Sequence, residues 1–201
     1  MVGRFFKIIL IVLFANVISL ADLLLPENKS LFPSHIAYAI QASEYEVKAA
    51  YIYHFTQFIQ WPESAFDEDT STFNICLMGG NPFGGALSPI IKRNYNGHPF
   101  SLVFPTDPTV IHRCHILYLN DLTSNRESEI ISIVADKPVL VISSNPGFVE
   151  QGGNIGFLNI NNSVRFAINR DAGKRRGLTS SAKLLEIAVD VVGNSTREQR
   201  Q

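Results

Sequence analysis

The sequence predicts an α/β fold: a three-layer sandwich whose mainly parallel sheet is followed by a C-terminal β-hairpin and helix. Short apolar runs alternate with helical periodicity between residues 44 and 144, as in consecutive βα units. The run "PVLVISS" (138–144) is apolar at nearly every position, which is typical of a strand covered on both faces of a parallel sheet. Two later strand-like runs flank Asn161-Asn162, a pair that favours a tight antiparallel turn.

The first element of the predicted domain is an amphipathic helix that begins after Ser43. Ser43 and Glu46 have the spacing of a capping box, and Pro62 disfavours helical geometry at the residue before it. We interpret His54 as a core histidine, because it lies on the apolar stripe. That predicted buried stripe consists of Val47, Ala50, Tyr51, His54, Phe55, Phe58 and Ile59.

The central segment predicts strands that alternate with helices. In order, it contains the strand "TFNICLMG", a glycine turn and short helix in "GNPFGGALSPII", the strands "PFSLVFP" and "CHILYLN", and the helix "SNRESEIISIVADK". Ile130, Ile131 and Val134 share one face of that helix. Because parallel strands need covered faces, we expect helices on both sides of the sheet.

The C-terminal part predicts a hairpin and one last helix. The hairpin strands are "NIGFLNI" (154–160) and "SVRFAIN" (163–169), and Thr179 or Ser180 is expected to cap the helix. The predicted apolar face of that helix contains Leu184, Leu185, Ile187, Ala188 and Val191. No linker divides residues 44–193, which we interpret as a single domain, and residues 194–201 form a polar tail.

Residues 1–39 have the pattern of a secretory signal peptide. Arg4 and Lys7 precede the apolar run "IILIVLFANVISL", and small residues favour cleavage after Ala39 or near Ala21. An uncleaved membrane anchor is the alternative, although Lys7 and further polar residues interrupt the apolar run. Export from the cytoplasm is therefore expected.

Export changes the interpretation of the two cysteines. In an oxidising compartment a lone pair most often forms a bridge, so Cys76 and Cys114 are expected to form a structural disulfide. Zinc binding by these cysteines together with His112 and His115 is the alternative. It is disfavoured, because adjacent residues of a strand point to opposite faces and a disulfide consumes the thiolates.

The motifs of catalysis and cofactor binding are not found in the chain. Gly79 and Gly84 have the outer spacing of a phosphate-binding loop, but Gly85-Ala86 replaces the Lys-Ser/Thr pair. No G-x-S-x-G or H-E-x-x-H motif occurs, so we expect no enzyme, cofactor or metal site. The formal net charge of −1 gives no basic field for nucleic acid. The segment "RDAGKRRGL" (170–178) is interpreted as a solvated loop, with contact to an acidic partner or a phosphate as the alternative.

Six ordered segments of the chain resemble the YfiR family of periplasmic regulators. They are "VKAAYIYHFTQFIQWP", "FNICLMGGNPFG", "CHILYLN", "PVLVISSNPGFVEQGGNIGFLN", "VRFAIN" and "GLTSSAKLLEIA", between residues 45 and 192. The resemblance implies a non-catalytic regulator that binds the periplasmic sensor part of an inner-membrane diguanylate cyclase and represses it. It further implies control of cyclic di-GMP and biofilm formation, sequestration by an outer-membrane, peptidoglycan-associated lipoprotein, and a homodimer. The two cysteines match positions that can be bridged in the family, which agrees with the disulfide expected above.

We hypothesise that the hairpin faces the partner. Ile155, Phe157, Arg165 and Ile168 are the candidate contact residues, because a hairpin at a sheet edge offers apolar side chains outside the obligatory core. The alternative function is a periplasmic small-molecule-binding sensor. In that reading, the loops "GGNPFGG" and "SSNPG" frame a crevice at the carboxyl ends of the strands.

Overall fold

A computed structural model describes residues 34–66 and 72–193, with side chains from residue 44 on. It divides the chain into two units, Met1–Ile40 and Gln41–Gln201. Most of the predicted signal peptide and the whole polar tail therefore lie outside the described residues, and residues 34–39 form the start of a helix. The cleavage of the signal peptide stays a prediction.

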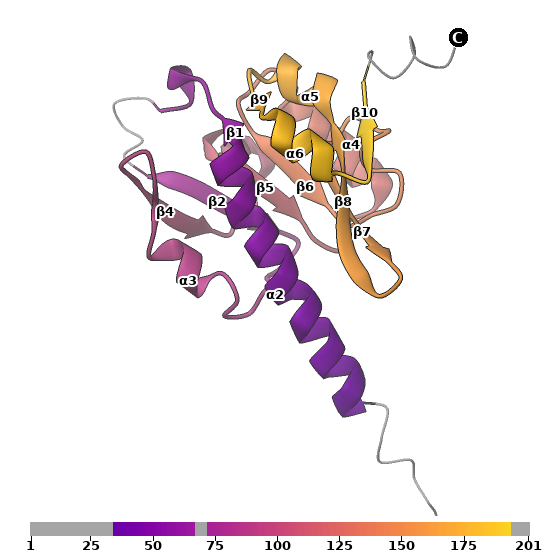
Figure 1. Ribbon diagram of the computed structural model, residues 1–201. Helices are drawn as coiled ribbons and strands as arrows, with labels where there is room; N and C mark the ends of the chain where they lie inside the picture. Colours follow the sequence, from indigo (N-terminus) through magenta and orange to yellow (C-terminus); the bar gives the residue numbers. More distant parts are fainter. Residues whose placement is uncertain (1–33, 67–71, 194–201) are drawn as a thin grey trace, which may run out of the picture. The chain divides into compact units, whose positions relative to one another are not determined.

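An eight-stranded sheet forms the centre of the second unit (Figure 1). Its strand order is β10-β8-β7-β6-β5-β2-β4-β3. In chain order the strands are β2 (Phe73–Met78), β3 (Asn94–Tyr95), β4 (His98–Val103), β5 (Ile116–Leu119), β6 (Leu140–Ser143), β7 (Ile155–Ile160), β8 (Ser163–Asn169) and β10 (Asp190–Val192). All pairings are parallel except β3 with β4 and the hairpin β7–β8. The predicted mainly parallel sheet is confirmed.

Helices cover the sheet on both faces. They are α2 (Ser34–Phe58), α3 (Ser88–Ile91), α4 (Ser124–Ile133), α5 (Arg170–Arg175) and α6 (Ala182–Ile187), together with the 3-10 turns η1 (Glu63–Ala65) and η2 (Pro108–Arg113). Two short strands, β1 (Ile59–Gln60) and β9 (Thr179–Ser180), form a separate antiparallel pair. In Figure 1, α2 and α6 lie in front of the sheet and α4 lies behind it.

The strand residues alternate between two hydrophobic cores. On one face, Phe73 and Ile75 pack with Phe55 of α2 and Leu184 of α6. On the other face, residues such as Leu117 and Val141 pack with α4, whose Ile130, Ile131 and Val134 are buried as predicted. Each fully buried aliphatic or aromatic side chain contributes about 1.5–3 kcal/mol. The two cores make the domain the predicted three-layer sandwich.

Helix α2 differs from its prediction at both ends. It begins at Ser34, so Ser43 lies inside the helix and does not cap it. The preceding segment "HIAYAIQA" contains no glycine or proline, and nothing in it stops a helix. The helix ends at Phe58, because the next two residues pair with β9 before Pro62 is reached.

The buried face of α2 is rotated relative to the predicted stripe. Val47 is 41% exposed, and Ala50 and His54 are also exposed, so His54 is not a core histidine. The buried positions of the helix are Lys48, Ala49, Ile52, Phe55 and Thr56, and Ile59 of β1 is buried next to them in sequence. Two of them, Lys48 and Thr56, are polar, so the apolar periodicity of the sequence did not assign them to the buried face. Each is buried because it has a hydrogen-bond acceptor: Lys48 donates to Ser144 and Thr56 donates to the Tyr53 carbonyl.

The hairpin forms as predicted, and its turn explains why two asparagines stand there. Asn161 and Asn162 have φ angles of 50° and 59°, in the left-handed region that asparagine tolerates better than most residues. The last helix is capped by Ser181, whose hydroxyl accepts from the Leu184 amide at 3.2 Å, rather than by Thr179 or Ser180. Those two residues are not free to cap it, because they form β9.

A buried disulfide joins Cys76 in β2 to Cys114 before β5 and confirms the sequence prediction. The two residues are 1% and 4% exposed, and both belong to the core beneath α4. The bridge closes a segment with a sequence separation of 38 residues, which includes β4 and η2. It therefore restricts the unfolded chain over a long loop.

Loss of this disulfide is expected to lower the free energy of unfolding by about 2–4 kcal/mol, since the unfolded chain regains the entropy of the open loop. Guanidinium unfolding of the Cys76→Ala/Cys114→Ala variant, compared with the oxidised protein, measures the difference. Adding reductant to the variant is the control and should change nothing. Equal stability of the variant and the oxidised protein would contradict this account.

Candidate functional site

The structure separates the four candidate contact residues of the hairpin. Ile155, Phe157 and Ile168 are 0%, 2% and 2% exposed and belong to the core beneath α2. Arg165 is exposed. The hairpin also does not end the sheet, because β10 pairs with β8 beyond it. The premise that these apolar side chains lie outside the core is therefore not met, whereas contact of Arg165 with a partner stays a prediction.

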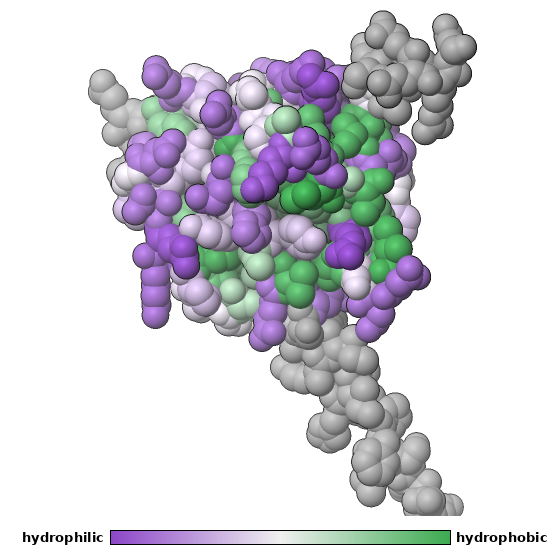
Figure 2. Space-filling model, in the orientation of Figure 1, coloured by the Kyte–Doolittle hydropathy of each residue, from purple (hydrophilic) through white to green (hydrophobic). Residues whose placement is uncertain are grey.

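An exposed apolar surface surrounds the outer edge of β8 instead. Strand β10 pairs with β8 only from Ala167 to Asn169, and the Val189 amide donates to the Phe166 carbonyl at 3.0 Å. Figure 2 shows hydrophobic residues gathered where Figure 1 draws α6, β10 and the hairpin. The β8 edge surface, as we name it, consists of Arg165, Ile187 and Val189, whose two apolar members are 51% and 45% exposed.

The crevice expected between the loops "GGNPFGG" and "SSNPG" is filled by side chains. Phe83 of the first loop packs against Tyr45 of α2 and Tyr118 of β5, with ring centroids 5.3 and 4.9 Å apart. The Tyr118 hydroxyl is 3.0 Å from the Ser144 hydroxyl at the start of the second loop. These contacts join α2 to the carboxyl edge of the sheet.

Lys48 is the charged centre of this cluster. Its ammonium donates to the Ser144 hydroxyl at 2.9 Å, pairs with Glu44 at 2.6 Å, and lies 4.6 Å from the Tyr45 ring centroid. Burial raises the pKa of Tyr118 and of Tyr45, so both phenols stay protonated at neutral pH. The Lys48 side chain thus has polar partners in Glu44 and Ser144, and the arrangement attaches α2 to the residue that follows β6.

The alternative of a zinc site is contradicted by the contacts of its proposed ligands. Cys76 and Cys114 are joined to each other and have no thiolate to offer. The ring of His115 is buried, with Nδ1 accepting from the Asn74 amide at 3.0 Å and Nε2 3.0 Å from the Ala65 carbonyl. Because Nδ1 accepts, Nε2 carries the proton, and neither nitrogen has a free lone pair for a metal. His115 therefore ties β2, β5 and η1 together.

A fully buried carboxylate on α4 escaped the sequence analysis. Glu127 is 0% exposed and accepts a short hydrogen bond from the Ser143 hydroxyl, which connects α4 to β6. Its other oxygen, Oε2, has no hydrogen-bond partner among the described residues. Glu127 lies three and four residues before Ile130 and Ile131, so the helical period placed it on the buried face, and only its charge argued against that position.

The segment "RDAGKRRGL" is not a solvated loop. It forms α5, capped by the Asn169 side chain, and Arg176 is 4% exposed. Its guanidinium donates to the Val134 carbonyl and to Asn154 Oδ1, each at 3.1 Å, and to the Ile131 carbonyl at 3.4 Å. Burial, aided by the charge of Arg175, lowers the pKa of Arg176 to about 10, which leaves it protonated at neutral pH. Arg176 therefore satisfies the last carbonyls of α4.

Comparison with known proteins places this architecture in a family. The family model described as YfiR/HmsC-like matches residues 45–189, which include the strands β2 to β8 and all the helices from α3 to α6. The chain belongs to the YfiR/HmsC-like family. This family is periplasmic and regulates diguanylate cyclase systems, and it is regulatory rather than catalytic.

Other comparisons add little to the family assignment. A solved conserved domain protein of Vibrio cholerae O1 biovar El Tor matches with a TM-score of 0.44 and 10% identity, over 62% of this chain and 55% of that protein. The chain thus spans about half the length of that protein. No curated protein matches the sequence. Within residues 34–66 and 72–193, no helix has both the length and the apolar character to cross a membrane.

Arg176→Met is expected to lower the free energy of unfolding by about 3 kcal/mol or more, because it removes a buried donor from the Ile131 carbonyl, the Val134 carbonyl and Asn154 Oδ1. Thermal or urea unfolding measures the change. The neighbouring Arg175→Met is the matched control, since Arg175 is exposed and should lose less than about 0.5 kcal/mol. Equal effects of the two substitutions would contradict a structural role for the Arg176 guanidinium.

Proposed function

We propose that this protein is a periplasmic repressor that binds the periplasmic sensor part of an inner-membrane diguanylate cyclase and holds the enzyme inactive. The match to the YfiR/HmsC-like family over residues 45–189 carries the proposal. When the repressor dissociates, the active cyclase raises the concentration of cyclic di-GMP and promotes biofilm formation. No catalytic step by this chain is needed, because its output is a binding equilibrium.

The disulfide agrees with a periplasmic location. A buried cystine that stabilises the fold forms and persists in an oxidising compartment. The predicted N-terminal signal peptide supplies the route of export. The formal net charge of −1 favours neither nucleic acid nor an anionic bilayer as the partner, which leaves a protein surface as the most consistent target.

We place the partner contact on the β8 edge surface. Exposed apolar residues beside an incompletely paired strand are a common basis of protein–protein association, because both the side chains and the strand edge are available. Arg165 adds one cation to the exposed apolar side chains of Ile187 and Val189. Arginine is enriched in binding hot spots, since its planar guanidinium makes several directed hydrogen bonds.

The proposal includes two further partners. An outer-membrane, peptidoglycan-associated lipoprotein sequesters the repressor and so frees the cyclase. A second copy of the chain forms a homodimer, which light scattering of the exported protein at several concentrations measures directly. A mass that stays monomeric at all concentrations would remove the homodimer from the proposal but not the repressor function.

The substitutions Arg165→Glu and Val189→Asp are each expected to weaken binding of the cyclase sensor domain about fivefold or more. The first reverses a charge of this chain in the contact, and the second places a new charge in its apolar part. Titration calorimetry with the purified sensor domain measures affinity, and cellular cyclic di-GMP reports the lost repression.

Ile133→Asp provides the matched control for these substitutions. Ile133 is 40% exposed on α4, on a different element from the β8 edge surface, and its substitution should leave binding unchanged. If Arg165→Glu and Val189→Asp bind as tightly as the unmodified protein, the contact lies elsewhere. If the unmodified protein binds no diguanylate cyclase sensor domain and deletion of its gene leaves cyclic di-GMP unchanged, the proposed function itself fails.

A further inference from the structure

A cavity of about 450 Å³ opens beside the carboxyl ends of two neighbouring parallel strands. Residues 78–80 at the end of β2 and residues 104–106 after β4 form two of its walls. Leu122 and Arg126, at the start of α4, form another. Its size lies within the range of small-molecule sites, which usually measure about 300–1,000 Å³.

The topology of the sheet favours a ligand at this place. The chain leaves β2 toward α3, whose Ile90 packs in the core beneath α2, and it leaves β5 toward α4 on the opposite face. Strands β2 and β5 are neighbours, so their outgoing connections diverge to opposite faces at this point. In open α/β sheets, such a divergence at the carboxyl ends of the strands is where ligands usually bind.

Two glycines leave part of the β2 wall of the cavity without side chains. Gly79 has a φ of +86°, and a Cβ atom there would lie 1.9 Å from the Asn120 carbonyl oxygen, so no other residue fits. Gly80 has a φ of +109° and more space around it. The Asn120 side chain donates to the Gly79 carbonyl at 3.2 Å and holds this turn against the end of β5. The backbone of this wall is therefore held against the end of β5.

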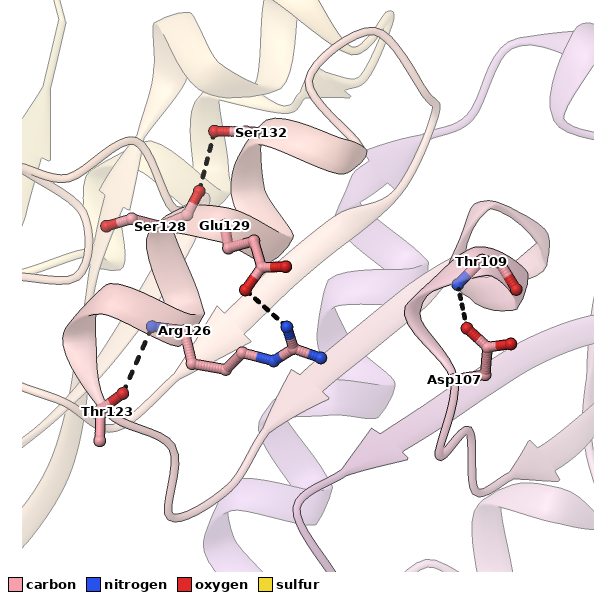
Figure 3. A network of polar contacts seen from close by, with 7 residues as sticks. All are labelled: Asp107, Thr109, Thr123, Arg126, Ser128, Glu129 and Ser132. Atoms are coloured by element: carbon pink, nitrogen blue, oxygen red, sulfur yellow. Dashed lines mark hydrogen bonds and ion pairs between the residues drawn. The ribbon is translucent and has the colours of Figure 1, made fainter.

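The remaining lining is apolar apart from one cation. Phe104 is 52% exposed at the cavity, and Met78 and Leu122 add aliphatic surface. Arg126 lies in the first turn of α4 and pairs with Glu129 through one guanidinium nitrogen at 2.5 Å (Figure 3). An arginine has five N–H donors, so this pair leaves most of them available. Asp107, the nearby carboxylate drawn in Figure 3, accepts from the Thr109 amide of its own turn, and no ion pair joins it to Arg126.

We propose that this cavity binds a small organic carboxylate with an aromatic or aliphatic body. Arg126 recognises the carboxylate, assisted by the positive end of the α4 dipole. The apolar wall of Met78, Phe104 and Leu122 receives the body of the ligand. An inorganic anion would leave this apolar wall exposed to water, and a neutral apolar molecule would leave the arginine unused. The site is independent of the β8 edge surface and of the proposed repression.

Phenylacetate and its neutral analogue phenylacetamide test the site on the exported, oxidised protein. We expect saturable binding of phenylacetate in NMR titrations, with shifts concentrated at residues 78–80 and 104–106. Phenylacetamide should bind at least about tenfold more weakly, because it lacks the charge-assisted hydrogen bonds. Arg126→Gln should weaken phenylacetate about tenfold or more for the same reason.

Two matched controls separate the site from general effects. Arg113→Gln removes the same charge from an exposed residue that does not line the cavity, and it should leave binding unchanged. Thr106→Trp places a large side chain at the cavity wall and should abolish binding, whereas Thr109→Trp in η2 should not. Equal binding of the acid and the amide, an unaffected Arg126→Gln variant, absent saturation, or binding of inorganic phosphate alone would each overturn the proposal.

Discussion

The need to cover both faces of a mainly parallel sheet governs the rest of this structure. The central strands have side chains in two separate cores, so neither face can be left to solvent without exposing large aliphatic residues. Helix α2 covers one face and α4 the other. Each helix is then attached by a buried polar side chain with a specific partner: Lys48 connects α2 to the end of β6, and Glu127 connects α4 to β6. The apolar layers supply the free energy, and these polar contacts select the orientation.

Much of the fold was predictable because strand and helix periods are local properties. The runs around Ile75, Leu117 and Val141 indicated buried strands, and Asn161-Asn162 indicated the hairpin turn. The rotation of α2 was not predictable from apolar periodicity, because two of its buried positions are Lys48 and Thr56. Lys48 is buried against Ser144, an acceptor that only the folded chain provides, whereas Thr56 donates to the Tyr53 carbonyl of its own helix. Likewise, the charge of Arg176 predicts a surface position, and its burial is explained only by the carbonyls at the end of α4, to which it donates in the fold.

The functional surface was less predictable than the fold. Ile155, Phe157 and Ile168 were assigned to an exposed hairpin, but α2 packs over that side of it. A strand pattern shows which residues share a face and does not show whether a helix covers that face. The three-residue strand β10 was also missed, since so short a segment has no measurable period. The family resemblance predicted the regulatory function. Which residues remain exposed at the surface could be determined only from the packed structure.

The contact between Lys48 and Ser144 spans 96 residues of sequence. Helix α2 precedes every strand of the sheet in the chain. The partner of its Lys48, however, lies just after β6, which follows β2 to β5 in the sequence. During synthesis or translocation, the aromatic side chains of α2 therefore have no sheet to pack against until most of the domain has emerged. Parallel pairings and contacts between residues far apart in sequence slow folding and prolong the lifetime of aggregation-prone intermediates. The order of the elements along the chain thus makes the apolar face of α2 one of the last surfaces to be covered during folding.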